Sequence, residues 1–122
     1  MFENVLLVTV DSLRALPNLD SDARAALGCY DRLRNLGGTE FPQAFATGPK
    51  TKSSFPGLLT GTYPLSVGGY GPVLKNRPFV ARNISEAGYE TGGFHSNPFL
   101  SKTFKYDTGF DHFRDYQNPL MG

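Results

Sequence analysis

The feature that most constrains the fold is an uninterrupted apolar run near the start of the sequence. Residues 4–10, Asn-Val-Leu-Leu-Val-Thr-Val, are mostly aliphatic and β-branched, with no alternation between apolar and polar positions. Such runs are typical of a central strand that is buried on both faces of a parallel sheet. We therefore predict an α/β fold in which residues 4–10 form the first strand and Asp11 follows at its carboxyl end.

The rest of the chain alternates predicted helices with two further strands. Residues 21–36 carry apolar side chains every three or four positions, with Ser21 as a cap and Gly37-Gly38 as a stop. Two shorter helices are predicted at 55–60 and 79–87, and two strands at 41–46 and 89–94. The tail from residue 98 onward is predicted to be irregular. This order indicates a partial parallel sheet flanked by helices, in a single domain spanning residues 1–122.

Composition narrows the classes of function. The net charge of +1 gives no basic excess of the kind that nucleic-acid binders carry, and no apolar stretch has the length of a membrane span. The start of the sequence lacks the features of a signal peptide. Cys29 is the single cysteine, so no internal disulfide is required. We expect a cytoplasmic protein that binds neither nucleic acid nor membrane.

Three polar groups follow the predicted strands at their carboxyl ends, where open parallel sheets bind ligands. They are Asp11, the loop 47–54 and His95. A carboxylate, a hydroxyl at a helix start and an imidazole at one edge could form a metal and oxyanion site. The structural alternatives stay open, because an Asp or a Ser/Thr in such positions often only caps a helix. Several hydroxyls also compete with Thr51 for a functional role: Thr47, Ser53 and Ser54.

Four segments, in family order, resemble the sulfatase family of the alkaline phosphatase superfamily. They are residues 4–14, residues 45–49 together with 54–64, residues 87–91 and residues 106–113. The second is the most specific, because its Leu-Leu-Thr-Gly-Thr-Tyr-Pro, residues 58–64, resembles the end of the family's nucleophile segment. The fourth, Tyr-Asp-Thr-Gly-Phe-Asp-His-Phe, resembles the family's GFD-containing segment. Together they cover nearly the whole chain.

The resemblance implies the N-terminal portion of an alkaline-phosphatase/sulfatase-like fold and a metal-dependent hydrolase of sulfuric or phosphoric esters. Asp11 then matches a metal ligand, and Thr51 matches the nucleophile, which also ligates the metal. The implied cofactor is a divalent cation: Ca²⁺, Mg²⁺ or Mn²⁺. The residues that we expect to bind the anion or support the site are Lys50, Lys52, Ser53 and His95.

The sequence departs from the family at the nucleophile. Many sulfatases carry Cys/Ser-x-Pro-Ser-Arg, from which formylglycine is made, whereas residues 51–55 here are Thr-Lys-Ser-Ser-Phe. A Thr cannot become formylglycine, and Thr nucleophiles are usual in the phospho-transferring branches of the superfamily. The family's other metal ligands come from a distal part of a longer domain. Asp11 and Thr51 offer only part of the roughly six oxygens that a hard cation requires.

We therefore expect a fragment of a sulfatase-like hydrolase that carries the nucleophile half of the site and has little or no activity, and no tightly bound metal, on its own. A complementary chain could supply the missing ligands, and uncovered strand edges favour a homo-oligomer. Two alternatives stay open. One is a non-catalytic module that binds an anion or a partner through the same loop. The other is a complete small phosphoesterase or phosphotransferase with a Thr nucleophile.

Overall fold

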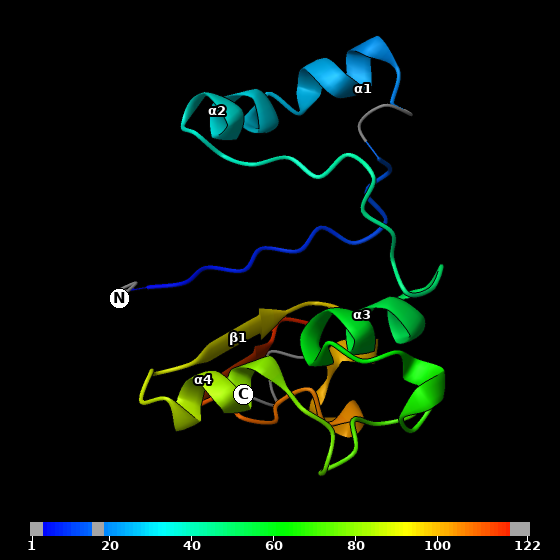
Figure 1. The fold of residues 1–122 in the computed structure, drawn as a ribbon, viewed down its shortest axis with the longest axis vertical. Helices are drawn as coiled ribbons and strands as arrows, with labels where there is room; N and C mark the ends of the chain where they lie inside the picture. Colours follow the sequence, from blue (N-terminus) through cyan, green and yellow to red (C-terminus); the bar gives the residue numbers. More distant parts are fainter. Residues whose placement is uncertain (1–3, 16–18, 118–122) are drawn as a thin grey trace. The chain divides into compact units, whose positions relative to one another are not determined.

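The computed structural model describes residues 4–15 and 19–117, and its helices and strands fall into two units, 1–45 and 46–122 (Figure 1). The first contains two short helices, and the second combines helices with a parallel pair of strands. The predicted α/β class is thereby confirmed, whereas the single-domain prediction stays a prediction. Among the described residues, no helix has the length and apolar character of a membrane span.

The helices of unit 1 are α1 (Ser21–Ala26) and α2 (Cys29–Asn35). The single helix predicted over 21–36 is thus interrupted by a turn at residues 27–28. The predicted cap is also corrected: it is Asp20 Oδ1, 2.8 Å away, that accepts a hydrogen bond from the Ala23 N–H. A carboxylate in this position satisfies one of the free N–H groups of the first turn.

Helix α2 ends where the sequence predicts, in a motif that requires glycine. The Gly37 N–H donates to the Arg34 carbonyl at 3.0 Å, and the Gly38 N–H donates to the Leu33 carbonyl at 3.0 Å. This is the Schellman pattern, in which the residue after the cap adopts a left-handed backbone. Gly37 has φ +87°, which a residue with a Cβ rarely adopts.

The two strands predicted at 4–10 and 41–46 are wrong: the structure assigns no strand to either segment. A strand needs a backbone neighbour, and none of the described residues pairs with these segments. The aliphatic side chains of residues 4–10 are 59–87% exposed. In the second segment, the Ala44 N–H donates to the Phe41 carbonyl at 3.3 Å, so the backbone turns instead of extending.

Unit 2 is built from one longer helix, several short ones and two strands. Its elements in chain order are α3 (Thr51–Thr60), η2 (Pro64–Ser66), α4 (Val80–Glu86), β1 (Gly92–His95), η3 (Pro98–Leu100), η4 (Lys102–Phe104) and β2 (His112–Asp115). The helices predicted at 55–60 and 79–87 are confirmed as α3 and α4, although α3 begins four residues earlier.

Strands β1 and β2 are parallel and in register, from Gly92 opposite His112 to His95 opposite Asp115. Strand β1 confirms the predicted third strand, shifted slightly toward its carboxyl end. Strand β2 lies in the tail that was predicted to be irregular, so that prediction is corrected. The connection between them contains the short helices η3 and η4 in place of the α-helix that parallel strands usually require.

The core of unit 2 is aromatic. Its buried apolar residues are Val73, Phe79, Ala81 and Tyr106. The fully buried ring of Phe79 makes edge contacts with Tyr106 and Phe110, each with ring centroids 6.2 Å apart. Burial raises the pKa of the Tyr106 hydroxyl to about 12, and the charge of Arg77 offsets part of that rise. This core packs against Phe113 of β2 and against Phe55 and Leu59 of α3.

A buried arginine closes the carboxyl end of α3. Arg77 is only 2% exposed, and its Nε donates to the hydroxyls of Thr60 at 3.1 Å and Thr62 at 2.8 Å. Its Nη2 donates to the Thr62 carbonyl at 3.2 Å. A cation at this end of a helix is favoured by the partial negative charge of the unpaired carbonyls. Arg77 thus ties the long connection after α3 back to that helix.

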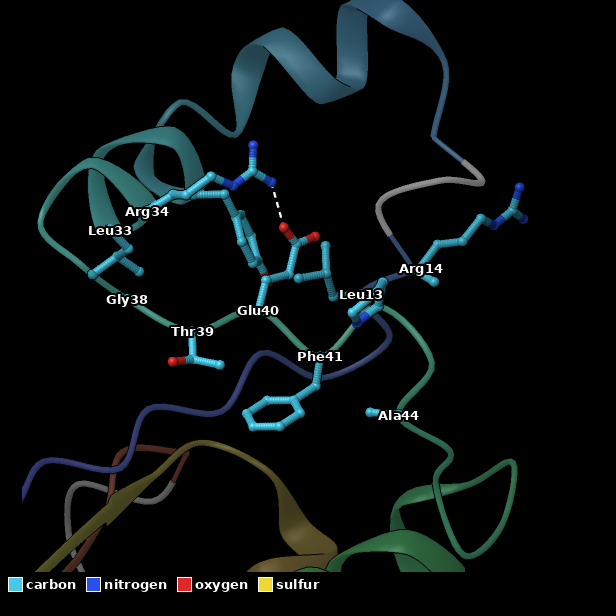
Figure 2. A pocket seen from close by; sticks show the side chains of 12 residues that line it. Leu13, Arg14, Leu33, Arg34, Gly38, Thr39, Glu40, Phe41 and Ala44 are labelled. Carbon is cyan, nitrogen blue, oxygen red and sulfur yellow. Dashed lines mark hydrogen bonds and ion pairs between the residues drawn. The ribbon is translucent and has the colours of Figure 1, made fainter.

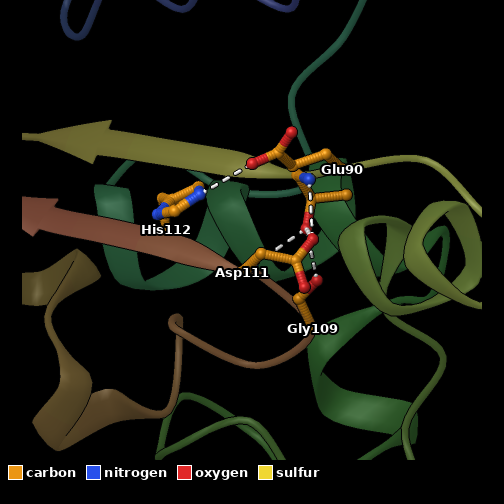
Figure 3. Close-up of polar contacts among 5 residues, drawn as sticks. Glu90, Gly109, Asp111 and His112 are labelled. Carbon is orange, nitrogen blue, oxygen red and sulfur yellow. Dashed lines mark hydrogen bonds and ion pairs between the residues drawn. The ribbon is translucent and has the colours of Figure 1, made fainter.

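The amino ends of β1 and β2 are joined by side-chain bonds (Figure 3). Asp111 Oδ2 accepts from the Thr91 N–H at 2.8 Å and from the Thr91 hydroxyl at 2.9 Å. These bonds, the backbone one first, lower the pKa of the Asp111 carboxyl. His112 and Glu90 make a second contact of 2.9 Å, but both side chains are exposed, so this pair contributes little stability.

Candidate functional site

The candidate nucleophile Thr51 is the first residue of α3, directly after the cap residue Lys50. Ser53 fixes this helix start: its Oγ accepts from the Lys50 N–H at 3.1 Å and donates to the Lys50 carbonyl at 2.9 Å. Ser53 is itself buried, so it acts here as a support for the helix start. The free N–H groups and dipole of a helix start favour a negatively charged ligand.

The loop before α3 lies close against the helix. The Thr47 hydroxyl donates to the Ser53 carbonyl at 2.8 Å. Gly57, on the next turn, makes this approach possible, because a Cβ at that position would clash with the Thr47 side chain. The loop that leads to Thr51 is therefore held by contacts on both Ser53 and Gly57.

Lys52 is oriented by aromatic rings. Its Nζ lies 4.5 Å from the centroid of Phe99 and 4.9 Å from that of Phe104. The two rings meet edge to face at 6.1 Å and connect η3 with η4. A cation over such faces is held electrostatically by the ring quadrupoles. The ammonium next to Thr51 therefore has a defined position, in contrast to the exposed Lys50.

His95 is the last residue of β1, and its side chain is only 8% exposed. Its ring lies 4.9 Å from that of Phe113, and Nδ1 lies 3.1 Å from the Asn97 carbonyl and 3.9 Å from Asp115 Oδ1. A carbonyl oxygen only accepts, so Nδ1 carries the proton in this contact. Nε2 is buried and has no hydrogen-bond partner among the residues that the structure describes.

Asn97 connects these two parts of the site, and the sequence reasoning missed it. Its Nδ2 donates to the Thr51 hydroxyl at 3.5 Å, while its backbone carbonyl faces His95. Thr51 and His95 are thus brought to one end of β1, as the sequence predicts. The Asn-Pro pair at 97–98 is a turn signal, which could have singled out Asn97 but not its distant neighbour.

Asp11, the predicted metal ligand, lies in a turn of unit 1, whereas Thr51 lies in unit 2. Among the described residues, no three acidic, His or Cys side chains gather where they could hold a metal ion. The residues described here therefore do not fit a divalent cation by themselves. The roles assigned to Asp11, Thr51, Lys50, Lys52, Ser53 and His95 stay predictions.

A pocket of about 430 Å³ lies within unit 1 (Figure 2). Tyr30 and Phe41 line it together with Arg34 and Glu40, which form an ion pair across its wall. None of the predicted site residues lines it.

The arrangement in unit 2 can position a hydroxyl at a helix start beside a neutral amide donor. Such a hydroxyl can act as a nucleophile when its proton is removed, and the helix start favours the anion that results from attack on a sulfate or phosphate ester.

Comparison with known families matches the chain over residues 3–121 to the family model described as Sulfatase. Neither the curated proteins nor the solved structures gave a match.

Proposed function

The chain belongs to the sulfatase family, and from this premise we propose that it carries the nucleophile half of a hydrolase of sulfuric or phosphoric esters. The observation that carries the proposal is the position of Thr51 at the first residue of α3, with the Asn97 amide 3.5 Å from its hydroxyl. The buried Ser53 supports that helix start.

In the proposed reaction, the Thr51 oxygen attacks the sulfur or phosphorus atom and loses its proton. The bond to the ester oxygen breaks, and the leaving alcohol takes up a proton. Water then splits the sulfo- or phospho-threonine, which releases the inorganic anion and restores the hydroxyl. Because residues 51–55 lack the Cys/Ser-x-Pro-Ser-Arg pattern, the threonine acts unmodified.

Members of the sulfatase family generally use a divalent metal. We propose Asp11 and Thr51 as the ligands that this chain contributes, with the remaining ligands supplied from outside its described residues. Among the described residues, no three His, Cys, Asp or Glu side chains gather where they could hold such a metal. That same observation favours a second candidate function, a non-catalytic module that binds an anion at the start of α3.

Phosphate binding tests the site. In a ¹⁵N-labelled sample, inorganic phosphate should move the backbone amide signals of residues 51–53 more than those of α4, because the helix start faces the anion. The titration is repeated with Mg²⁺, Ca²⁺ or Mn²⁺ present. If phosphate leaves the signals at the start of α3 unmoved, the proposed site is wrong.

Turnover separates the candidate functions. The chain and its Thr51→Ala variant should hydrolyse aryl sulfates and aryl phosphates equally poorly, because the metal ligands are incomplete. Metal-dependent turnover that disappears in Thr51→Ala would instead identify a complete small enzyme. Phosphate binding without turnover, even when a complementary chain with the missing ligands is added, would favour the non-catalytic module.

A further inference from the structure

Asn97 stands two residues after β1 and directly before η3, at the carboxyl end of the sheet. Its side chain is the polar group closest to Thr51 for which the structure gives a distance, with Nδ2 3.5 Å from the hydroxyl oxygen. These two residues are 46 positions apart in the sequence. Their contact therefore joins the start of α3 to the end of β1.

The orientation of the Asn97 amide is fixed by η3. The Phe99 N–H donates to Asn97 Oδ1 at 2.9 Å, which makes Asn97 the N-cap of that short helix. A backbone N–H needs an acceptor, so the amide oxygen must face Phe99. The NH₂ group is consequently the end that faces Thr51.

The main chain of Asn97 is fixed as well. Its carbonyl accepts from His95 Nδ1 at 3.1 Å, and the imidazole is held against the Phe113 ring. The side chain of His95 is nine-tenths buried, so this anchor belongs to the packed part of unit 2. Asn97 is thus held by bonds at its carbonyl and at its amide oxygen, and neither of these two bonds uses Nδ2, which donates to the Thr51 hydroxyl.

We propose that Asn97 is a positioning residue for the Thr51 hydroxyl, an inference that rests on the proposed function of Thr51. An N–H donated to the oxygen occupies one lone pair and directs the remaining lone pair and the proton elsewhere. The same donor stabilises the negative charge that develops on the oxygen as its proton leaves. An amide neither gains nor loses a proton in this role, so it orients the nucleophile without acting as its base.

The first test reads the contact directly by NMR of the Asn97 side-chain NH₂ group. Thr51→Val removes the hydroxyl and keeps the shape, so at least one of the two protons should shift upfield as it loses its acceptor. Thr51→Ser keeps the oxygen and should restore the signal. Ser54→Ala is the matched control, because Ser54 bonds only to the Lys50 carbonyl among the contacts given for its hydroxyl. If the Asn97 side-chain NH₂ signals have the same chemical shifts in Thr51→Val as in the parent chain, the proposal is overturned.

A second test separates positioning from capping. Asn97→Ser keeps a good N-cap for η3 but is too short to reach Thr51, whereas Asn97→Ala loses both functions. We expect Asn97→Ser to keep the melting temperature of the parent chain and to bind inorganic phosphate several-fold more weakly. Unchanged phosphate affinity in Asn97→Ser would overturn the positioning role. If phosphate fails to bind the parent chain, the proposed function is contradicted instead. The Thr51→Val experiment then still decides whether the contact between Asn97 and Thr51 exists.

Discussion

The ring of Phe79 in unit 2 is fully buried, whereas the aliphatic side chains of residues 4–10 in unit 1 are more than half exposed. Both regions are rich in apolar residues, so composition does not explain the difference. Unit 2 has helices and a strand pair that enclose its aromatic rings. Unit 1 has two short helices and no paired strand among its described residues. Apolar sequence becomes a core only where other elements are placed to cover it.

Among the variants that test this contrast between the two units, Phe79→Ala should have the largest effect on stability. Removing a fully buried aromatic ring with two edge contacts should cost about 3–5 kcal/mol of unfolding free energy, a large part of the total for a small domain. Urea unfolding followed by circular dichroism measures it. The matched control is Phe45→Ala in unit 1, where the ring is 92% exposed and the expected change is within about 0.5 kcal/mol. Equal losses in the two variants would break the comparison.

Acidification should have an intermediate effect on the stability of unit 2, because it protonates Asp111. Because its bonds to Thr91 lower the pKa of the Asp111 carboxyl below its ordinary value of 3.8, the folded state favours the carboxylate. This contribution to stability is present above pH 3.8 and is lost as the pH falls through the lower, folded-state pKa. Asp111→Asn should therefore show a weaker loss of stability on acidification than the parent chain. The check is urea unfolding in a series of buffers from neutral pH to below that value.

Thr91 provides the control for this acid effect. Thr91→Val removes one of the two donors to Asp111, so the pH dependence should shrink without vanishing. In the double variant Thr91→Val, Asp111→Asn, the two changes should not add, because they act on one contact. Full additivity would show that Asp111 draws its stabilisation from another group.

The smallest effect on stability, but a clear one on association, is expected from Leu6→Lys. Leu6 is 87% exposed within an aliphatic segment, and contact with a second copy would gain roughly 25 cal/mol for each Å² of apolar surface that is buried. The net charge of +1 opposes such contact only weakly. We expect the parent chain to form dimers or larger assemblies in sedimentation equilibrium, and Leu6→Lys to reduce them.

The control for association is Leu65→Lys, which replaces a leucine of similar exposure, 78%, outside the aliphatic segment. It should leave the assembly unchanged. A parent chain that sediments as one species near 13.4 kDa at every concentration would contradict the prediction.

Local signals in the sequence predicted the two α-helices of unit 2, α3 and α4, but not its short helices η2, η3 and η4. A glycine stop and an apolar spacing lie within the element that they define, so α3 and α4 were found within a few residues. Strand β2 was missed because His112, Arg114 and Asp115 give it the composition of a loop. Only its pairing with β1, about twenty residues earlier, makes it a strand.

For the candidate site, too, the sequence predicted what depends on a local pattern and missed what depends on contacts between distant segments. His95 could be placed at the end of a strand from the pattern of residues 89–94 alone, and the structure puts it there. The contact of Asn97 with Thr51 depends on how α3 packs beside the sheet, which no local pattern encodes. The strand predicted at 4–10 failed for the same reason, because a pattern records apolar character and not the neighbours that would cover it.

The parallel pairing of β1 with β2 affects when unit 2 can fold during synthesis, because β2 lies late in the sequence. The pair cannot form until Asp115 has been translated, about a hundred residues after the aliphatic segment 4–10. At about 5–20 residues per second, the ribosome needs roughly 5–20 seconds for that stretch. The aliphatic segment therefore leaves the ribosome many seconds before the sheet of unit 2 can close, and during that time it offers an extended apolar peptide to a chaperone that binds such segments.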